Sequence, residues 1–400
     1  MITFCKRMRR KILLISLVAL LTWTGCSRST PASSTSCVPP PVKVAFPHHV
    51  LWGQGDELPA HVLPPKEWEP QLSDGQSQKL KTLYSISSIV ARSRDDIWIT
   101  TSRDLARYRP STHELITYTV KVDEGGAFFV PSELFLAKDG TLWGIGVTGY
   151  SAWDLGLSSK FRGILSHYDA KADRFEPVLD KDGILTEGPG STWMSEDAQG
   201  ILWLVKDDVL FSFDPASRQA KRVLDQRQGY LFKNLVGAPD GTIWLAATPV
   251  EQPRGVPIVI RYDPRTGKIE YHGPPPETKE DDFIGSLYLD RAGRLWADDY
   301  GWLELPARGE PVWYQIVPSP VFVTRMQAGE FTYSWLRPHR VYESSNGLFW
   351  FSSGAGLVRL DLKSGDWCLV TTLNSPVAED DAHNLWIAGN GQIYKHRLQP

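Results

Sequence analysis

The stretch DGTLWGIG, residues 139 to 146, joins a turn pair to bulky apolar residues and a tryptophan that small residues follow. The same order recurs six more times in this 400-residue chain. The seven tryptophans of these copies, called the motif tryptophans below, are Trp98, Trp143, Trp203, Trp244, Trp296, Trp350 and Trp386. Repetition of this kind outweighs a domain count made from length alone.

A turn precedes each motif tryptophan. Five copies have Gly before the apolar residues, and the same place holds Asp96 or Asn384 in the other two. These residue types tolerate a left-handed backbone, so we expect a positive φ there. A left-handed residue between two short β-rich runs predicts a tight hairpin, with the tryptophan on the strand that leaves it.

A second turn follows each of five motif tryptophans. An aromatic residue or Leu precedes Asp or Arg, and in four copies Pro, Ser, Thr or Gly follows within a few positions, as in Tyr262-Asp263-Pro264-Arg265-Thr266-Gly267. The other copies begin at Tyr108, Tyr168, Phe213 and Leu360. This composition is typical of turns and places a strand end at the aromatic residue.

Each repeat therefore predicts a four-stranded antiparallel meander. One such sheet cannot bury both of its faces, whereas seven sheets packed around an axis can, with the tryptophans between neighbours. The spacings between motif tryptophans, from 36 to 60 residues, favour this arrangement over a solenoid. We therefore predict an all-β fold, a seven-bladed β-propeller.

The last repeat is one strand short, since only Gln392 to Arg397 follow Trp386 as strand-forming residues. Spare β-capable sequence lies before the first repeat, around Val42 to Leu63. We expect an N-terminal strand from this segment to complete the seventh sheet and leave no exposed edge. Trp52 and Trp68 are expected to pack against that strand.

The repeat resembles the two-component regulator propeller repeat, whose consensus joins Asp-x-x-Gly-x-Leu-Trp to a later Tyr-Asp-Pro turn, and streptogramin lyases share this propeller type. The resemblance covers residues of about 80 to 398. It implies a propeller that in this family often forms the extracytoplasmic sensor of a hybrid histidine kinase. Because propellers serve many roles, the resemblance is specific for fold and weak for function.

The N terminus has the pattern of an export signal. Five Lys and Arg residues between Lys6 and Lys11 precede the apolar run Ile12 to Leu21, which is too short for a permanent membrane span. The Gly25-Cys26 pair that follows resembles the lipobox of bacterial lipoproteins and implies lipidation of Cys26. Trp23 departs from the usual Leu, which leaves ordinary cleavage or an uncleaved anchor as alternatives.

These features divide the chain into a signal peptide (1–25), a lipidated Ser/Thr/Pro-rich tether (26–41) and one propeller domain (42–400). We expect a protein anchored by lipid to the outer side of a bacterial membrane. Removal of five positive and no negative residues from a chain of net charge −3 leaves −8. This charge argues against nucleic acid as a partner.

Two cysteines remain in the expected mature domain and tether besides Cys26. Cys37 and Cys368 are candidates for a disulfide, because exported proteins keep such bonds. Two separate thiols remain an equal alternative, since the sequence does not show the distance between them.

Three insertions indicate where a ligand binds. The motif tryptophan and the second turn are 11 residues apart in three repeats, but 26 apart after Trp143 and 19 apart after Trp244. A third excess falls around Pro318 to Arg340. In a meander, the connection between the second and third strands and the crossover to the next blade emerge on the same face. All three insertions should therefore share one face.

These insertions carry aromatic and cationic side chains, which suit glycans, small molecules or an envelope protein. The candidate ligand-binding residues are Tyr150, Trp153, Arg162, Arg254, Trp335, Arg337, His339 and Arg340. Loops that only cap the ring and pack on their own aromatics are the alternative. We assign no ligand role to the motif tryptophans.

Signals for catalysis are weak. Gly144-Ile145-Gly146-Val147-Thr148-Gly149 matches a dinucleotide fingerprint in letters, but no helix pattern follows it to hold a pyrophosphate. Glu270 and His272 are expected to form an exposed pair on an outer strand. We therefore predict no catalytic residue, metal site or cofactor.

The main hypothesis is a tethered propeller with a sensory or recognition role. A propeller lyase or hydrolase of the streptogramin lyase type, and an envelope scaffold without a small ligand, remain as alternatives.

Overall fold

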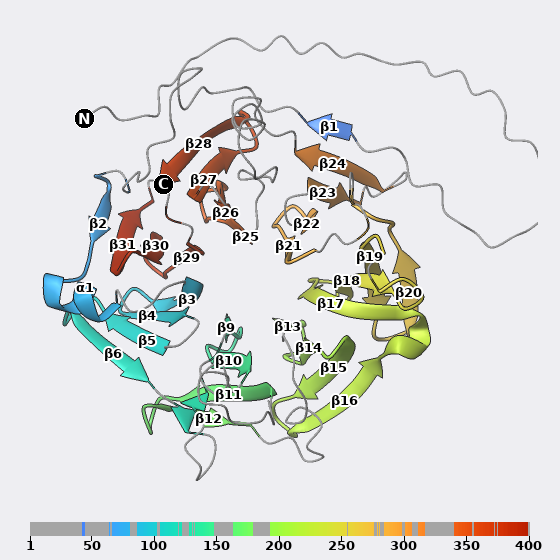
Figure 1. Cartoon of the computed structure of the whole chain (residues 1–400), viewed down its shortest axis with the longest axis horizontal. Helices are drawn as coiled ribbons and strands as arrows, with labels where there is room; N and C mark the ends of the chain where they lie inside the picture. The colour runs from blue at the N-terminus through green and yellow to red at the C-terminus, as the bar shows by residue number, and fades with distance from the viewer. Residues whose placement is uncertain are drawn as a thin grey trace, which may run out of the picture.

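The computed structural model contains one ring of β-sheets (Figure 1). It describes these residues: 42–44, 64, 66–80, 86–101, 105–118, 120–121, 128–129, 131, 133–147, 163–178, 193–253, 255–275, 278, 280, 284–297, 301–305, 311–316, 340–353, 356–371, 373 and 375–398.

The described strands form seven blades, each with four strands in antiparallel order from the centre outward, as predicted from the repeats. Blade 1 contains β3 (Ile86–Ser93), β4 (Asp96–Thr101), β5 (Leu105–Arg109) and β6 (Glu114–Tyr118). Blade 2 contains β9 (Glu133–Leu136), β10 (Leu142–Val147), β11 (Gly163–Asp169) and β12 (Arg174–Pro177). Blade 3 contains β13 (Trp193–Glu196), β14 (Leu202–Lys206), β15 (Val209–Asp214) and β16 (Gln219–Leu224). Blade 4 contains β17 (Tyr230–Gly237), β18 (Ile243–Pro249), β19 (Ile258–Asp263) and β20 (Lys268–Tyr271).

The remaining blades follow the same order. Blade 5 contains β21 (Leu287–Leu289), β22 (Leu295–Ala297), β23 (Gly301–Glu304) and β24 (Val312–Ile316). Blade 6 contains β25 (Arg340–Glu343), β26 (Phe349–Ser353), β27 (Gly356–Asp361) and β28 (Asp366–Thr371). Blade 7 contains β29 (Ala378–Glu379), β30 (Asn384–Gly389), β31 (Gln392–Arg397) and β2 (Trp68–Pro70). Outside the blades lie α1 (Asp74–Leu80), the 3-10 turn η1 (Gln226–Gln228) and the pair β7 (Val120–Lys121) and β8 (Phe128–Phe129).

The motif tryptophans fill the spaces between blades, and each is at most 5% exposed. Seven hydrophobic clusters lie between neighbouring blades, and each contains one motif tryptophan. In the cluster that joins blade 7 to blade 1, Trp386 packs with Ile97, Ile99 and Tyr108. The prediction that indoles separate the sheets of a closed ring is confirmed.

A residue six positions before the tryptophan holds the indole in several blades. The indole Nε1 donates to a carboxylate in three of them: Trp203 to Asp197 (2.9 Å), Trp296 to Asp290 (2.8 Å) and Trp386 to Asp380 (2.8 Å). In blade 6, Ser344 takes the place of the aspartate, and its hydroxyl accepts from Trp350. These contacts orient the indole as well as bury it, because a buried N–H needs an acceptor.

An N-terminal strand closes the ring, as predicted, but a different one from the segment we expected. The closing strand is Trp68–Pro70, which pairs antiparallel with β31, so the placement within Val42 to Leu63 is wrong. Trp68 is buried. The plane of its ring lies at 79° to that of Trp350, and the ring stacks on His396. Trp52 lies outside the described residues. The three residues of β1 (Val42–Val44) instead pair parallel with β24 at the outer edge of blade 5.

The first hairpin of each blade explains the repeated glycine. φ lies between 79° and 83° at Gly140, Gly200, Gly241, Gly293 and Gly347. The predictions for Asp96 and Asn384 are wrong, because neither has a positive φ. In blade 7 the left-handed residue is His383, and Asn384 pairs with Asp380 as part of the strand. In blade 1 the turn is one residue shorter, with Ser93 opposite Asp96, and it has no left-handed position.

The hairpins and the second turns lie on the same face of the ring, which we call the turn face. In blade 1 the two meet directly, since the Ser111 amide donates to Asp95 at 2.7 Å. Hairpins of neighbouring blades are also joined: the amides of Lys138, Arg291 and Ser345 donate to Glu196, Glu343 and Glu379 of the next blade. The opposite face, called the loop face, carries the connections between second and third strands and the crossovers between blades.

Candidate binding face

All three insertions join strand ends on the loop face, as the sequence predicts. Residues 148–162 connect β10 to β11, residues 250–257 connect β18 to β19, and residues 317–339 connect β24 to β25. Seven of the eight candidate binding residues fall outside the described residues: Tyr150, Trp153, Arg162, Arg254, Trp335, Arg337 and His339. Their role stays a prediction, while the strand ends that carry them are defined.

The insertion of blade 4 is described at all positions but one, and it is tied to the crossover from blade 3. The Val250 amide donates to the carbonyl of Gly229 at 3.0 Å. Within the insertion, the Gly255 amide donates to Gln252, which closes a short turn. The bond between Val250 and Gly229 shows that an insertion and a crossover meet on one face.

The crossover itself is ordered by Asp225, which caps η1. Its carboxylate accepts from the Arg227 amide at 3.0 Å, and Gln228 accepts from the Asp225 amide at 2.6 Å. Hydrogen bonds from the side chain and the amide of Arg227 lower the pKa of Asp225. The carboxylate thus stays charged at neutral pH and holds the crossover in place.

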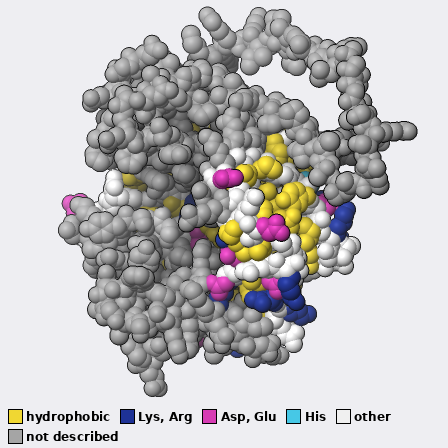
Figure 2. Space-filling view, turned by 45° about the vertical axis from the view of Figure 1, so that its right-hand side comes forward, with side chains coloured by type: hydrophobic (Ala, Val, Ile, Leu, Met, Phe, Trp, Pro, Cys, Tyr) yellow, Lys and Arg dark blue, Asp and Glu magenta, His cyan; other side chains and the backbone are white. Residues whose placement is uncertain are grey.

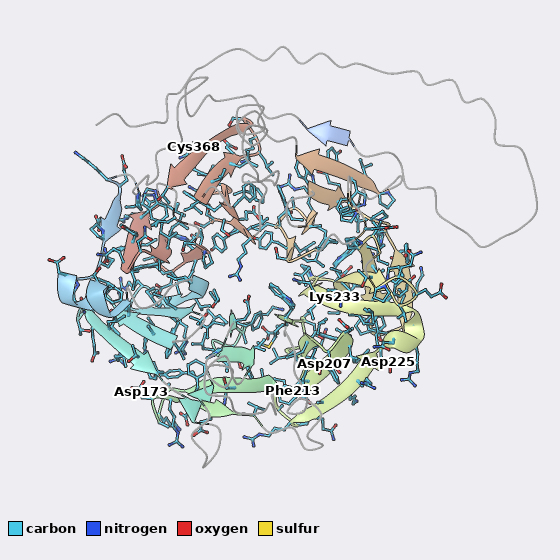
Figure 3. The ribbon with its side chains drawn as sticks, viewed as in Figure 1. Asp173, Asp207, Phe213, Asp225, Lys233 and Cys368 are labelled. Carbon is cyan, nitrogen blue, oxygen red and sulfur yellow. The ribbon has the colours of Figure 1, made fainter. Side chains whose placement is uncertain are left out.

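The second-to-third-strand connection of blade 3 is a tight turn through Asp207 and Asp208, whose φ values are 51° and 63°. Asp208 accepts from the ammonium of Lys233 on β17, and its carbonyl accepts from the Phe232 amide. Burial raises the pKa of Asp207, and the neighbouring Asp208 adds to the effect while Lys206 opposes it. These contacts fasten blade 3 to blade 4 at the loop face (Figure 3).

Arg340 is the one candidate binding residue that the structure describes, and it lies on β25 rather than in the preceding insertion. Its guanidinium donates to the carbonyl of Ser87 on β3, and to Glu133 Oε1 on β9 at 3.2 Å. Because β3 and β9 belong to blades 1 and 2, the side chain reaches across the inner part of the ring. Arg340 therefore fixes the end of the third insertion to two other blades.

Glu133 is the partner that sequence reasoning missed. Its side chain is 25% exposed, and burial raises the pKa of its carboxyl, while the charge of Arg340 opposes that increase. Glu133 is the first residue of β9 and lies outside the hairpin, tryptophan and second turn that define the repeat, so the repeat pattern does not identify it. The pair becomes visible only when three blades are placed around one axis.

Arg340→Met should reduce stability by about 1 kcal/mol at pH 7 and by clearly less at pH 4. At pH 7 the variant leaves an ionised, half-buried carboxylate without its cation. A carboxyl whose pKa is raised on folding lowers stability at pH values above its ordinary, unfolded-state pKa. This loss disappears as the pH falls toward that value and Glu133 becomes protonated in both states. Urea unfolding at the two pH values measures the difference.

The control is the double variant Arg340→Met/Glu133→Gln, which has no carboxylate to titrate at this position. Its loss of stability should be the same at pH 4 and pH 7. An equal loss for the single variant at both pH values would contradict the assignment of an ion pair.

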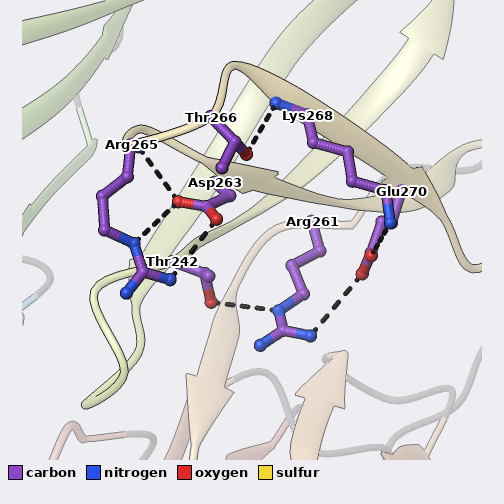
Figure 4. A pocket seen from close by; sticks show the side chains of 7 residues that line it. All are labelled: Thr242, Arg261, Asp263, Arg265, Thr266, Lys268 and Glu270. Carbon is purple, nitrogen blue, oxygen red and sulfur yellow. Dashed lines mark hydrogen bonds and ion pairs between the residues drawn. The ribbon is translucent and has the colours of Figure 1, made fainter.

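A hollow of about 280 Å³ lies on the turn face of blade 4 (Figure 4). It is lined by Thr242, Arg261, Asp263, Arg265, Thr266, Lys268 and Glu270. The charged groups are paired with one another: Arg265 with Asp263 at 3.0 Å and Lys268 with Glu270 at 2.7 Å. Carboxylates of the hollow already neutralise these cations. We therefore place the candidate binding site on the loop face instead.

The prediction of an exposed Glu270–His272 pair is wrong for the histidine. His272 is 8% exposed: its amide still pairs with Val259 of β19, and its ring centroid lies 4.8 Å from that of Trp244. Burial lowers the pKa of His272. Tyr271, between these two residues, is 45% exposed and packs against Tyr230. Figure 2 shows apolar side chains beside Lys, Arg, Asp and Glu on the described part of one side of the molecule.

Other sequence signals acquire structural roles. Leu142–Val147, which includes the first glycines of the fingerprint-like stretch, is strand β10. Cys368 is buried on β28, and Cys37 lies outside the described residues, so their pairing stays a prediction. Among the residues described, no group of three or more metal-ligating side chains gathers. Within that same set, no helix has the length and apolar character needed to cross a membrane.

Comparison with known proteins gives similarity at the level of structure. No protein-family model matches the chain, and no curated protein matches it by sequence. The extracellular domain of a protein described as a hybrid two component system from B. thetaiotaomicron is similar, with a TM-score of 0.53 and 14% identity. That match covers 80% of this chain and 40% of the other, so the chain spans less than half of its length.

Two further structures have lower scores. An auxiliary nutrient binding protein from Bacteroides ovatus has a TM-score of 0.40 at 13% identity, covering 76% of this chain and 66% of that one. A protein from Lactobacillus plantarum has a TM-score of 0.45 at 13% identity, covering 72% and 85%. At 14% identity, the similarity to the extracellular domain with a TM-score of 0.53 concerns the fold alone, and it agrees with the repeat resemblance in the sequence.

Proposed function

We propose that this protein is a membrane-tethered, extracytoplasmic propeller that recognises a ligand or a protein partner through its loop face. The basic and apolar N-terminal segment and Cys26 support export and lipid attachment. The fold is one that an extracellular domain of a hybrid two component system also uses, which agrees with a recognition role outside the cytoplasm.

The observation that carries the proposal is the common position of the three insertions. They extend from strand ends on one face of a ring whose blades are joined by buried indoles and by hydrogen bonds between hairpins. Loops that a rigid scaffold presents are the usual place for binding residues. The turn face, by contrast, carries short hairpins whose carboxylates accept from the chain's own amides.

The residues of the insertions define the chemistry of the partner. Trp153 and Trp335 supply flat apolar surfaces, and Arg162, Arg254 and Arg337 supply cations that bind hydroxyls or carboxylates. A glycan, a small polar aromatic molecule or an aromatic-rich envelope protein fits this combination. Because Arg340 already has two partners within the ring, we assign it a positioning role.

Trp153→Ala and Trp335→Ala should each strongly weaken binding of the ligand found by screening glycans and metabolites against the mature protein. Loss of an aromatic anchor commonly costs 2 kcal/mol or more, roughly a thirtyfold drop in affinity. Calorimetric titration measures the affinity, and the melting temperature of each variant should stay close to that of the parent. Unchanged affinity in both variants would count against the proposed face.

Globomycin, which blocks cleavage of lipoprotein signals, should cause an uncleaved precursor to build up in cells that express the full chain. The precursor would be detected by its lower mobility on a gel. Cys26→Ser provides the matched control and should release the protein from the membrane fraction. No precursor in treated cells would contradict lipidation.

A further inference from the structure

The direction of the two N-terminal strands shows at which face of the propeller each of them begins. In blade 5 the hairpin between β21 and β22 lies on the turn face, and the next strands alternate, so β24 runs from the turn face to the loop face. β1 pairs parallel with β24 and runs the same way. Val42 therefore lies at the turn-face end of its strand.

The closing strand gives the same direction independently. β31 ends at the turn face, because the Leu398 amide donates to His383 in the hairpin of blade 7. β2 pairs antiparallel with β31, so Trp68 lies at the turn-face end. At the other end, the Leu72 amide donates to Gln392, and the chain continues to α1. Both N-terminal strands thus begin at the turn face.

From these two strands we infer that the anchored propeller stands with its turn face toward the membrane and its loop face toward the surroundings. The inference rests on the proposed lipid anchor at Cys26. The sequence has 15 residues between Cys26 and Val42, and a random-coil chain of that length has an end-to-end distance of about 20 Å. A strand of five or six residues is about as long, ~17–20 Å. Turning the body over would therefore require the tether to stretch along the whole side of a blade.

This orientation suits the proposed function, because the insertions then face ligands that arrive from outside. On the turn face, carboxylates accept hydrogen bonds from the chain's own amides, as in Asp95–Ser111 and Glu196–Lys138. β1 sits at the outer rim of the ring beside β24 (Figure 1), so the tether leaves the body at its edge.

The test compares the distance of the two faces from a lipid surface. Blade 4 offers a matched pair of exposed positions, Arg265 between β19 and β20 on the turn face and Gln252 between β18 and β19 on the loop face. Arg265→Cys and Gln252→Cys, each combined with Cys37→Ser, receive a donor dye. Cys368 is buried and is left unchanged. The lipid-modified full chains are reconstituted into vesicles of phosphatidylcholine with an acceptor dye on the headgroups.

Energy transfer should be about twice as efficient from position 265 as from position 252, given a separation of roughly one strand length, ~17–20 Å. Equal transfer, or stronger transfer from position 252, would overturn the orientation while leaving the anchor intact. Failure of both variants to sediment with the vesicles, as expected for Cys26→Ser, would overturn the anchor and the orientation together. Inserting 30 Gly/Ser residues after Ser36 should remove the difference between the two positions.

Discussion

Trp386→Ala should lower the free energy of unfolding by about 3–5 kcal/mol, because it empties the space between the last blade and the first. The indole is fully buried, and it packs with Ile97, Ile99 and Tyr108 while it donates to Asp380. No other described cluster joins blade 7 to blade 1. The loss should therefore weaken closure of the ring as well as one local contact.

Urea unfolding followed by circular dichroism measures this effect. Trp386→Phe is the matched control, since it keeps an aromatic ring between the sheets and loses the hydrogen bond to Asp380. Its cost should be clearly smaller than that of Trp386→Ala. A loss below about 1 kcal/mol for the alanine variant would mean that the interface between blades 7 and 1 does not hold the ring together.

Asp290→Ala should cost about 3–5 kcal/mol, although it removes only a small side chain. The fully buried carboxylate accepts from the Trp296 indole, the Arg294 guanidinium and the amides of Ala292 and Arg294. Removal leaves the buried Trp296 N–H without an acceptor, and it also removes the acceptor of the partly buried Arg294 guanidinium. Chemical denaturation measures the loss.

Asp139→Ala tests whether the cost comes from burial rather than from loss of a hairpin aspartate. Asp139 is exposed, and its carboxylate accepts from the Thr141 amide at 2.8 Å. Its replacement should cost about 1 kcal/mol or less. Similar losses for Asp290→Ala and Asp139→Ala would contradict the role given to the carboxylate beneath the indole.

The repeat predicts the architecture because it contains both turns of each blade. Gly140 and its counterparts set the first hairpin, and Asp263 and its counterparts bind the amide two residues later to set the second. The repeat is less accurate for single positions within the first hairpin. The hairpin of blade 7 has the same length as that of blade 2, and its left-handed residue His383 lies three positions before Trp386, so the prediction of Asn384 was one residue too late.

The closing strand shows why some elements resist prediction. β2 has three residues and includes Pro70, so its pattern carries little signal, and its place depends on the free edge of β31. The parallel pairing of β1 with β24 likewise depends on an edge that exists only once blade 5 has formed. Short strands of this kind are specified by the partner edge more than by their own sequence.

The position of the three insertions was predicted from the sequence, whereas the binding role of their residues stays a prediction. The lengths of the connections correctly assign three insertions to one face, because strand direction alternates along each blade. The contact of Arg340 with Glu133 and Ser87 was not predictable, since it joins three blades far apart in the sequence. A visible signal was overlooked at Asp197, Asp290 and Asp380, each six residues before a motif tryptophan.

The central claim is that buried tryptophans join the blades into a ring and that the insertions of this ring bind the ligand. Hydrogen exchange at the indole N–H groups tests it most directly. In 15N-tryptophan-labelled protein, the resonances of Trp203, Trp296, Trp350 and Trp386 should exchange slowly, because each N–H is buried and bonded. Those of Trp153 and Trp335 should exchange rapidly and should change position when ligand binds. Rapid exchange at the four motif indoles, with protection at the two insertion indoles, would contradict the account.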